Sequence, residues 1–296
     1  MTTFLREAFR VKRRSYPERI RAALFLAIKR TAANLDACVK VPGKDFSRTR
    51  KLPLQAMLLM LTGMGTGSLS KELYDWFGYT SSTATASAFV QQRNKIRPEA
   101  VKMVFNEFVS STTPTATFQG YRLFAVDGSD LRLPSDPTND FSLIRNAEGQ
   151  KQYNLAHLNA MFDLMSKVYV DATTMQGKKG MNEHSALVSM VDQSKYTIGL
   201  ACLHGKKTDF LLQEVFARLI LYNHASLVAR QIPAPQGKQI NFSVAILACK
   251  QFLKGKIRSA QIFEILSMHL SPIRPGRQYK RYQNPVSAVA FQYRLS

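Results

Sequence analysis

The stretch Tyr121–Pro134, YRLFAVDGSDLRLP, constrains the fold of this chain strongly. Its apolar run Leu123–Val126 stops at an acidic segment that contains Asp127 and Asp130, and an alternating apolar-polar segment follows. We predict a buried strand, a tight turn in which Gly128 reverses the backbone, and a return strand. A carboxylate at the end of a buried strand can bind a hard cation such as Mg²⁺ through oxygen. The two aspartates could equally be ordinary hairpin residues, since Asp-Gly turns are common.

Helical periodicity dominates on both sides of this stretch. Apolar residues recur three and four positions apart, and the helices that we predict span 17–39, 52–61, 69–77, 83–96, 98–109, 181–193, 208–230, 242–253 and 259–270. A strand hairpin is expected at 155–163 and 167–174. We therefore predict an α/β protein with three regions: helical residues 1–117, a small sheet region at 118–193, and helical residues 194–296.

The formal net charge of +21 is distributed unevenly along the chain. Residues 1–60 contain 14 Lys and Arg against four Asp and Glu, and residues 194–296 contain 15 against three. Residues 121–193 contain seven against nine, so two basic flanks enclose a slightly acidic middle. Such flanks are typical of proteins that bind a polyanion, because each neutralised phosphate releases counterions. A ribosome-associated or merely solubilising surface is the alternative.

Two segments offer candidate contacts to nucleic acid. The helices at 69–77 and 83–96, joined by a short turn, could form a helix-turn-helix whose second helix presents side chains to bases and phosphates: Gln91, Gln92, Arg93 and Lys95. The basic tail 271–281 contains Arg274 and Arg277, which could contact phosphates. Most helix pairs with such a turn are only packing units, which remains the alternative for the first segment.

Several other classes of protein find no support in the sequence. The three cysteines, Cys38, Cys202 and Cys249, are scattered, which argues against a disulfide framework and for a reducing compartment. The five histidines have no zinc-type spacing, and neither a P-loop nor a dinucleotide fingerprint is present. The most apolar window, 52–64, is too short to span a bilayer, which needs about 20 residues. We expect a soluble, intracellular protein without a membrane partner.

Three further acids could share a metal site with Asp127. They are Asp130, Asp171, which lies in the second strand of the expected hairpin, and Glu183, which opens the helix at 181–193. Each could instead have a structural role; Glu183, for example, suits the positive end of a helix dipole.

Several segments of the sequence also resemble a known family. The segments VDGSDLRLP, YNLAHLNAMFDLMSKVYVDATTMQGKKGMNEHSALVSMVD, KYTIGLACLH, QEVFARLILYN and HLSPIRPGR resemble, in the same order, bacterial DDE transposases of the fourth insertion-sequence family. The resemblance implies a ribonuclease H-like catalytic domain, here between the two helical regions. It also implies DNA transposition by three acids and two divalent cations, Mg²⁺ or Mn²⁺. Asp127 matches the first acid, as a catalytic residue and a metal ligand.

The same comparison implies that the centre of the catalytic domain is deleted. In the family the catalytic Glu lies in a Tyr-x2-Arg-x3-Glu-x6-Lys pattern just before the KYTIGL text. Here MVDQ at 190–193 continues directly into SKYTIGL at 194–200, and only the closing Lys of that pattern has a match, Lys195, which is also a candidate DNA contact. The second Asp and the Glu of the triad have no match, so a truncated sheet of three strands and one helix is expected. One carboxylate cannot hold two metal ions about 4 Å apart, and we expect impaired catalysis and doubtful metal binding.

The deletion also has consequences for partners. The edge of the strand at Leu123–Val126 would lack its neighbour, which predicts low stability or oligomerisation. The resemblance implies binding of double-stranded DNA at terminal inverted repeats, in the cytoplasm of a bacterium and in association with the nucleoid. Three functions remain open: an impaired transposase that still binds DNA, an active metal-dependent enzyme with substitute acids, and a non-catalytic regulator that binds transposon ends or joins the intact transposase.

Overall fold

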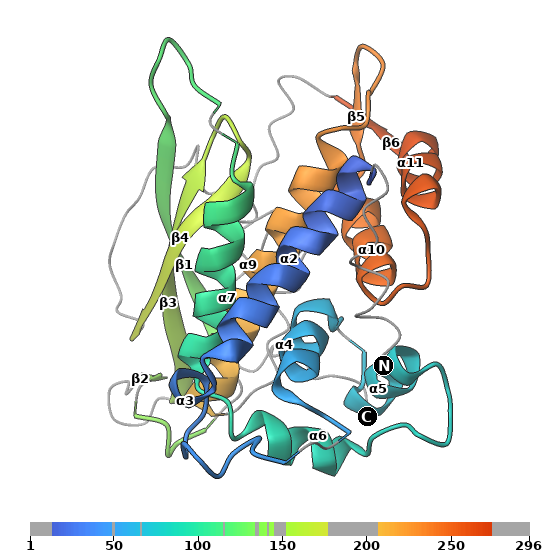
Figure 1. The fold of residues 1–296 in the computed structure, drawn as a ribbon. Helices are drawn as coiled ribbons and strands as arrows, with labels where there is room; N and C mark the ends of the chain where they lie inside the picture. The colour runs from blue at the N-terminus through green and yellow to red at the C-terminus, as the bar shows by residue number, and fades with distance from the viewer. Residues whose placement is uncertain are drawn as a thin grey trace.

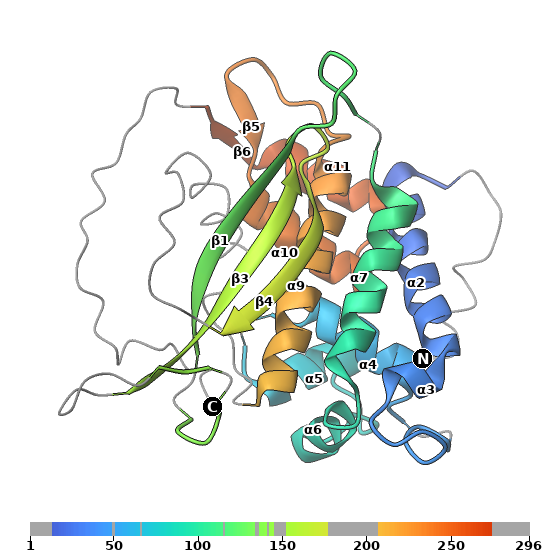
Figure 2. The same cartoon turned by 90° about the vertical axis from the view of Figure 1, so that its left-hand side faces the viewer.

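The computed structural model describes residues 14–48, 51–65, 67–114, 116–133, 136–140, 142–144, 152–176 and 207–273. Within the strands, the side chains of residues 127, 132, 173, 175 and 176 are outside this description. The described part is a mixed α/β structure: a small antiparallel sheet lies against one side of a helical body (Figures 1 and 2). None of its helices has the length and apolar character needed to cross a membrane.

The helical body is built around one long helix, α9 (Thr208–Ala229). Helices from both ends of the chain pack around it: α2 (Tyr16–Ala33), α4 (Leu54–Gly63), α7 (Pro98–Thr112) and α10 (Phe242–Leu253). The shorter helices are α3 (Leu35–Cys38), α5 (Leu69–Phe77), α6 (Ala86–Arg93) and α11 (Ser259–Met268). The N-terminal and C-terminal helical regions therefore share one core.

Local signals explain where the helices begin and end. Glu18 accepts a hydrogen bond from the Ser15 backbone N–H at 2.9 Å and closes a capping box at the start of α2. Ser68 accepts from the backbone N–H of Lys71 and caps α5, which ends at Gly78 with φ of +69°. The predicted helices that fall on described residues are confirmed, with ends displaced by a few residues and a break at Asn34 in the helix expected at 17–39. The helix predicted at 181–193 lies outside the described residues.

Within the described residues the sheet contains four strands: β1 (Phe124–Leu133), β2 (Leu143–Ile144), β3 (Tyr153–Asp163) and β4 (Val168–Gln176). β3 is central, with β1 on one edge and β4 on the other, and all described pairings are antiparallel. The β3–β4 hairpin is confirmed, whereas β2 lies in a stretch for which no strand was predicted. A second ribbon, β5 (Lys238–Ile240) with β6 (Leu270–Pro272), was likewise not predicted.

The tight turn predicted at Asp127–Asp130 is wrong. β1 runs without interruption through these residues, paired with β3 from Phe124 opposite Asp163 to Leu133 opposite Asn154. The eleven residues of β3 offer an unbroken partner, so the backbone has no reason to reverse. Gly128 has a different role from the one inferred, because it lies in extended backbone and is absent from the described glycines with positive φ.

Side chains of α9 attach the helical body to the sheet. The Asn223 side chain accepts from the backbone N–H of Tyr169 in β4 and donates to its carbonyl oxygen, both at 2.8 Å. The ring of Tyr222 makes edge contacts with Phe162 and Tyr169. These contacts identify the face of the sheet that packs on α9 as the one containing Phe162.

One buried polar side chain of α9 lacks such a partner. His224 is fully buried between the rings of Phe108 and Phe252, and neither ring nitrogen has a hydrogen-bond partner among the described residues. Burial, with the positive charge of Arg21 as a smaller cause, lowers the pKa of His224 to about 3.

This histidine predicts acid sensitivity. Its folded pKa lies below the unfolded value of about 6.5, so the unfolded chain binds the extra proton first. The free energy of unfolding should fall as the pH is lowered from about 6.5 towards 3, by up to about 1.4 kcal/mol per pH unit from this residue. His224→Leu should flatten the dependence measured by urea denaturation, while the exposed control His269→Leu should not. An equal pH slope in His224→Leu and the parent would contradict this assignment.

Candidate functional site

The backbone register defines the surroundings of Asp127, the acid predicted to bind metal. Position 127 lies in the middle of β1, opposite Ala160 of β3, which is itself opposite Ala172 of β4. Neighbouring positions on the same side of β1 are Ala125 and Ser129, since alternate residues of a strand share a face. This is the face that packs on α9, because it contains Phe162. Position 127 therefore belongs to the helix-covered face, with Ala160 opposite it in β3 and Ala172 one strand further across the sheet.

The substitute acids Asp130 and Asp171 lie on the other face. Asp130 is three residues from Asp127 in a continuous strand, and an odd separation places the two on opposite sides. Asp171 is opposite Met161, which is likewise on the second face. The expectation that these acids share a site with Asp127 is therefore corrected. The turn that would have brought them together does not form. Glu183 lies outside the described residues.

Gly128 makes room for a polar cluster on this second face. A Cβ atom at position 128 would lie 2.5 Å from Nε2 of His157 and 3.1 Å from Oδ1 of Asn159. The His157 ring extends along the strand surface, with Nδ1 2.8 Å from Oδ1 of Asp130 and Nε2 3.2 Å from Asn159. The Asp-Gly pair thus marks a close side-chain approach and not a turn.

The described residues do not form a metal-binding site. Among them, no group of three His, Cys, Asp or Glu side chains is arranged to hold an ion. The Asp130–His157 pair is a hydrogen-bonded couple with one carboxylate, whereas a two-ion centre needs several carboxylates. The role of Asp127 as metal ligand stays a prediction.

The candidate base-reading residues on and after α6 lie in different surroundings. Gln91 is exposed, and its amide contacts Ser87 at 3.1 Å. Gln92 and Lys95 are half-buried and contact each other at 3.3 Å. These three remain accessible to a partner, and their contact with DNA stays a prediction. Lys195, Arg274 and Arg277 lie outside the described residues.

Arg93 points inward, which corrects its assignment as a surface contact. Its guanidinium donates to Glu214 at 3.0 Å, to Gln213 at 2.9 Å and to the carbonyl oxygen of Phe210 at 2.6 Å, all on α9. Both members of the Arg93–Glu214 ion pair are almost completely buried. Arg93 therefore fastens α6 to α9, and its donors are used within the protein.

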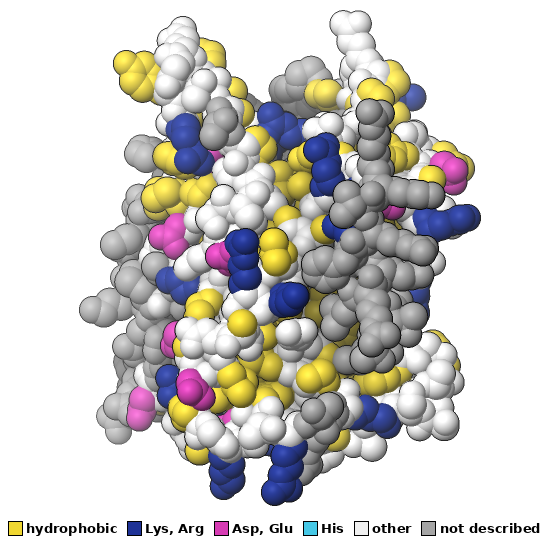
Figure 3. Space-filling view, viewed as in Figure 1, with side chains coloured by type: hydrophobic (Ala, Val, Ile, Leu, Met, Phe, Trp, Pro, Cys, Tyr) yellow, Lys and Arg dark blue, Asp and Glu magenta, His cyan; other side chains and the backbone are white. Residues whose placement is uncertain are grey.

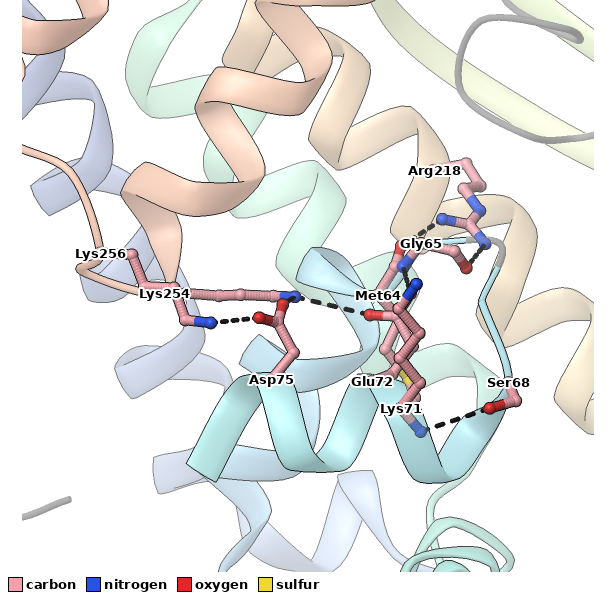
Figure 4. A network of polar contacts seen from close by, with 9 residues as sticks. All are labelled: Met64, Gly65, Ser68, Lys71, Glu72, Asp75, Arg218, Lys254 and Lys256. Carbon is pink, nitrogen blue, oxygen red and sulfur yellow. Dashed lines mark hydrogen bonds and ion pairs between the residues drawn. The ribbon is translucent and has the colours of Figure 1, made fainter. Parts of the chain in front are cut away.

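A second polar network, which sequence reasoning missed, joins α5 to the C-terminal helices (Figure 4). Lys254 forms ion pairs with Glu72, at 3.5 Å, and with Asp75, and Lys256 also pairs with Asp75. Burial alone would raise the pKa of Asp75, but the hydrogen bonds from Lys254 and Lys256 hold it below its ordinary value. Arg218 of α9 completes the region by donating to the carbonyl oxygens of Met64 and Gly65.

The network neutralises Glu72 and Asp75 of α5. On the face drawn in Figure 3, Lys and Arg side chains lie at the top, centre and bottom and do not gather in one patch. The sequence signal that could have revealed the network is the pair Glu72 and Asp75, one helical turn apart, with the Lys-Gly-Lys motif at 254–256.

Comparison with known proteins supports a relationship to transposases. Over 186 residues the chain is 24% identical to the transposase InsG for insertion sequence element IS4 of Escherichia coli strain K12. The match covers 56% of this chain and 42% of InsG, so the chain spans less than half of that relative. No protein-family profile and no solved structure matches the chain. The similarity bears out a relationship to insertion-sequence transposases.

Because Arg93 is buried and paired with Glu214, we expect its substitution to lower the stability of the protein whether or not DNA is present. Arg93→Ala should leave a buried carboxylate without its main cation and lower the free energy of unfolding by about 3–5 kcal/mol. The double variant Arg93→Met/Glu214→Leu should recover much of this loss, because no lone charge is buried. Gln91→Ala, on the exposed side of the same helix, serves as the control in urea denaturation. A stable Arg93→Ala variant would show that the pair does not fasten α6.

Proposed function

We propose that this chain is a transposase-derived protein that binds DNA and has lost strand cleavage. The similarity to InsG supports the transposase relationship. The net charge of +21, concentrated in the two flanks of the chain, supports binding to a polyanion. The proposed substrate is double-stranded DNA, with the terminal inverted repeats of an insertion sequence as the preferred target.

The proposal that cleavage is lost is supported by residues 127, 160 and 172, which lie side by side across β1, β3 and β4. Phosphoryl transfer by two metal ions requires several carboxylates around ions about 4 Å apart. On the face that contains Asp127, the positions opposite it in β3 and then β4 are both alanine. Asp130 and Asp171 are on the far face and cannot substitute. We propose that the chain lacks the central segment that would supply the second Asp and the Glu.

A regulator of the intact transposase is the second candidate, favoured by the edge of β1. In the described part of the chain, β1 pairs with β3 alone, and two apolar side chains at its start are exposed: 43% for Phe124 and 53% for Val126. A strand edge of this kind can accept another strand. A protein that binds transposon ends and associates with itself or with the intact transposase would act without cleaving.

Binding and cleavage can be tested separately. Wild-type protein should bind inverted-repeat DNA more tightly than random DNA in fluorescence anisotropy, and the logarithm of both affinities should fall with the logarithm of salt concentration. Equal affinity for both sequences at all salt concentrations would identify a generic basic protein. Failure to bind either DNA would contradict the proposed function.

In a nicking assay with Mg²⁺ or Mn²⁺ on the same repeats, wild-type protein and Asp127→Ala should both leave the DNA intact. Cleavage by wild-type protein that Asp127→Ala abolishes would show an active enzyme and overturn the proposed loss. Glu183→Ala would then test whether this acid completes the site.

A further inference from the structure

An exposed pair of stacked tyrosines stands at the end of α5, in the turn that leads to α6. Tyr74 is 47% and Tyr79 67% exposed, and their ring centroids are 5.7 Å apart with an interplanar angle of 21°. The turn 78–85 projects from the body at the lower right of Figure 1. Two large aromatic rings held in contact with each other and open to solvent form a preformed stacking surface.

Backbone geometry fixes the pair. Gly78 and Tyr79 both have positive φ, +69° and +59°, and the backbone N–H of Tyr79 donates to the carbonyl oxygen of Tyr74 at 2.9 Å. This is the Schellman arrangement, in which the residue after the glycine contacts the last turn of the helix. A tyrosine is uncommon in left-handed conformation. The Schellman motif commonly includes an apolar contact between these two positions, so the motif alone explains why the side chains touch. It does not require that both be aromatic.

Hydroxyl groups form hydrogen bonds within the turn. Thr80 donates to the carbonyl oxygen of Phe77 at 3.1 Å, and Thr83 donates to that of Thr80 at 2.7 Å. The hydroxyls of Thr80 and Ser82 are 2.7 Å apart. The two rings are therefore held by a turn that is already ordered, which lowers the entropic cost of binding a ligand.

The charge around the pair suits a nucleic-acid strand. Residues 76–98 contain no Asp or Glu, and their cations outside the core are Lys95 and Arg97, because Arg93 is buried against Glu214. Exposed Lys71 lies one turn before Tyr74, on the same side of α5. The nearby acids Glu72 and Asp75 are neutralised by Lys254 and Lys256. Exposed aromatic rings beside an exposed lysine are the elements of a site that stacks bases while a cation holds a phosphate.

We propose that Tyr74 and Tyr79 form a stacking platform for an unpaired base of a DNA strand, with Lys71 contacting a phosphate. This inference rests on the proposed DNA-binding function and assigns it a site. The platform recognises the flat face shared by all bases, so it contributes affinity for single-stranded segments without reading sequence.

The test measures binding of a fluorescein-labelled oligothymidylate of about 16 nucleotides, the upper range for one single-strand site, and of a duplex of equal length. Tyr74→Ala/Tyr79→Gly removes both rings, and glycine tolerates the positive φ of position 79. Single-strand affinity should fall by about 5- to 150-fold, the range for losing one stacked base. The salt slope should stay unchanged, because no cation is removed. Lys71→Ala should instead reduce the slope by about 0.7.

Two controls separate stacking from apolar contact. Tyr74→Phe/Tyr79→Phe retains the rings and should bind as wild type, whereas Tyr74→Leu/Tyr79→Leu retains apolar contact only and should bind as weakly as the ring-deleted variant. Exposed Tyr121, outside this region, provides a matched control as Tyr121→Ala, which should bind as wild type. The fluorescence of Trp76, the single tryptophan, reports whether each variant is folded.

Each contrary outcome has a distinct meaning. Wild-type affinity in the ring-deleted or leucine variants, with wild type binding both DNAs, would overturn the platform and leave the proposed function standing. If wild type binds neither DNA, the proposed function fails and the platform fails with it. Should the Ala/Gly variant not fold, the leucine variant decides, because it keeps the apolar contact of the Schellman motif.

Discussion

The structure depends on the burial of α9 on almost every side. Seventeen of its 22 residues are buried, so each polar side chain that it contributes to the interior needs a partner from a neighbouring element. Glu214 and Gln213 receive Arg93 of α6, Arg218 reaches the carbonyl oxygens after α4, and Asn223 pairs with β4. These buried hydrogen bonds and ion pairs fix the positions of the neighbouring helices and of the sheet relative to α9. His224 is the exception, because its ring nitrogens have no hydrogen-bond partner among the described residues.

Much of the helical architecture could be predicted from sequence because its signals are local. Apolar spacing located α9 and α10, while Ser68 and Gly78 marked the ends of α5. The inward direction of Arg93 could not be predicted in this way. Its partners lie about 120 residues away, and nothing near position 93 distinguishes a buried guanidinium from an exposed one. The β5–β6 ribbon could not be predicted either, because its two strands are short and lie far apart in the chain.

The candidate site shows how one local signal can have two physical causes. The pair Asp127-Gly128 predicts a turn if the glycine is present because it can adopt a positive φ. Here the glycine is needed because the His157 ring crosses the strand at that point. The chemistry changes with the cause: a turn would gather Asp127 and Asp130 at one end of the strand, whereas a continuous strand sends them to opposite faces. Similarity to InsG supports the ancestry of the chain, and the register supports the proposed loss of cleavage.

The outer edge of β1 has a consequence for how the protein can exist in a cell. Within the described residues this edge carries ten positions of regular extended backbone with no second neighbour. Any extended peptide that meets it can add a row of main-chain hydrogen bonds. Because such pairing joins two molecules, its extent would rise with protein concentration. A low copy number would then keep the chain apart from its own copies, whereas overproduction would favour their association.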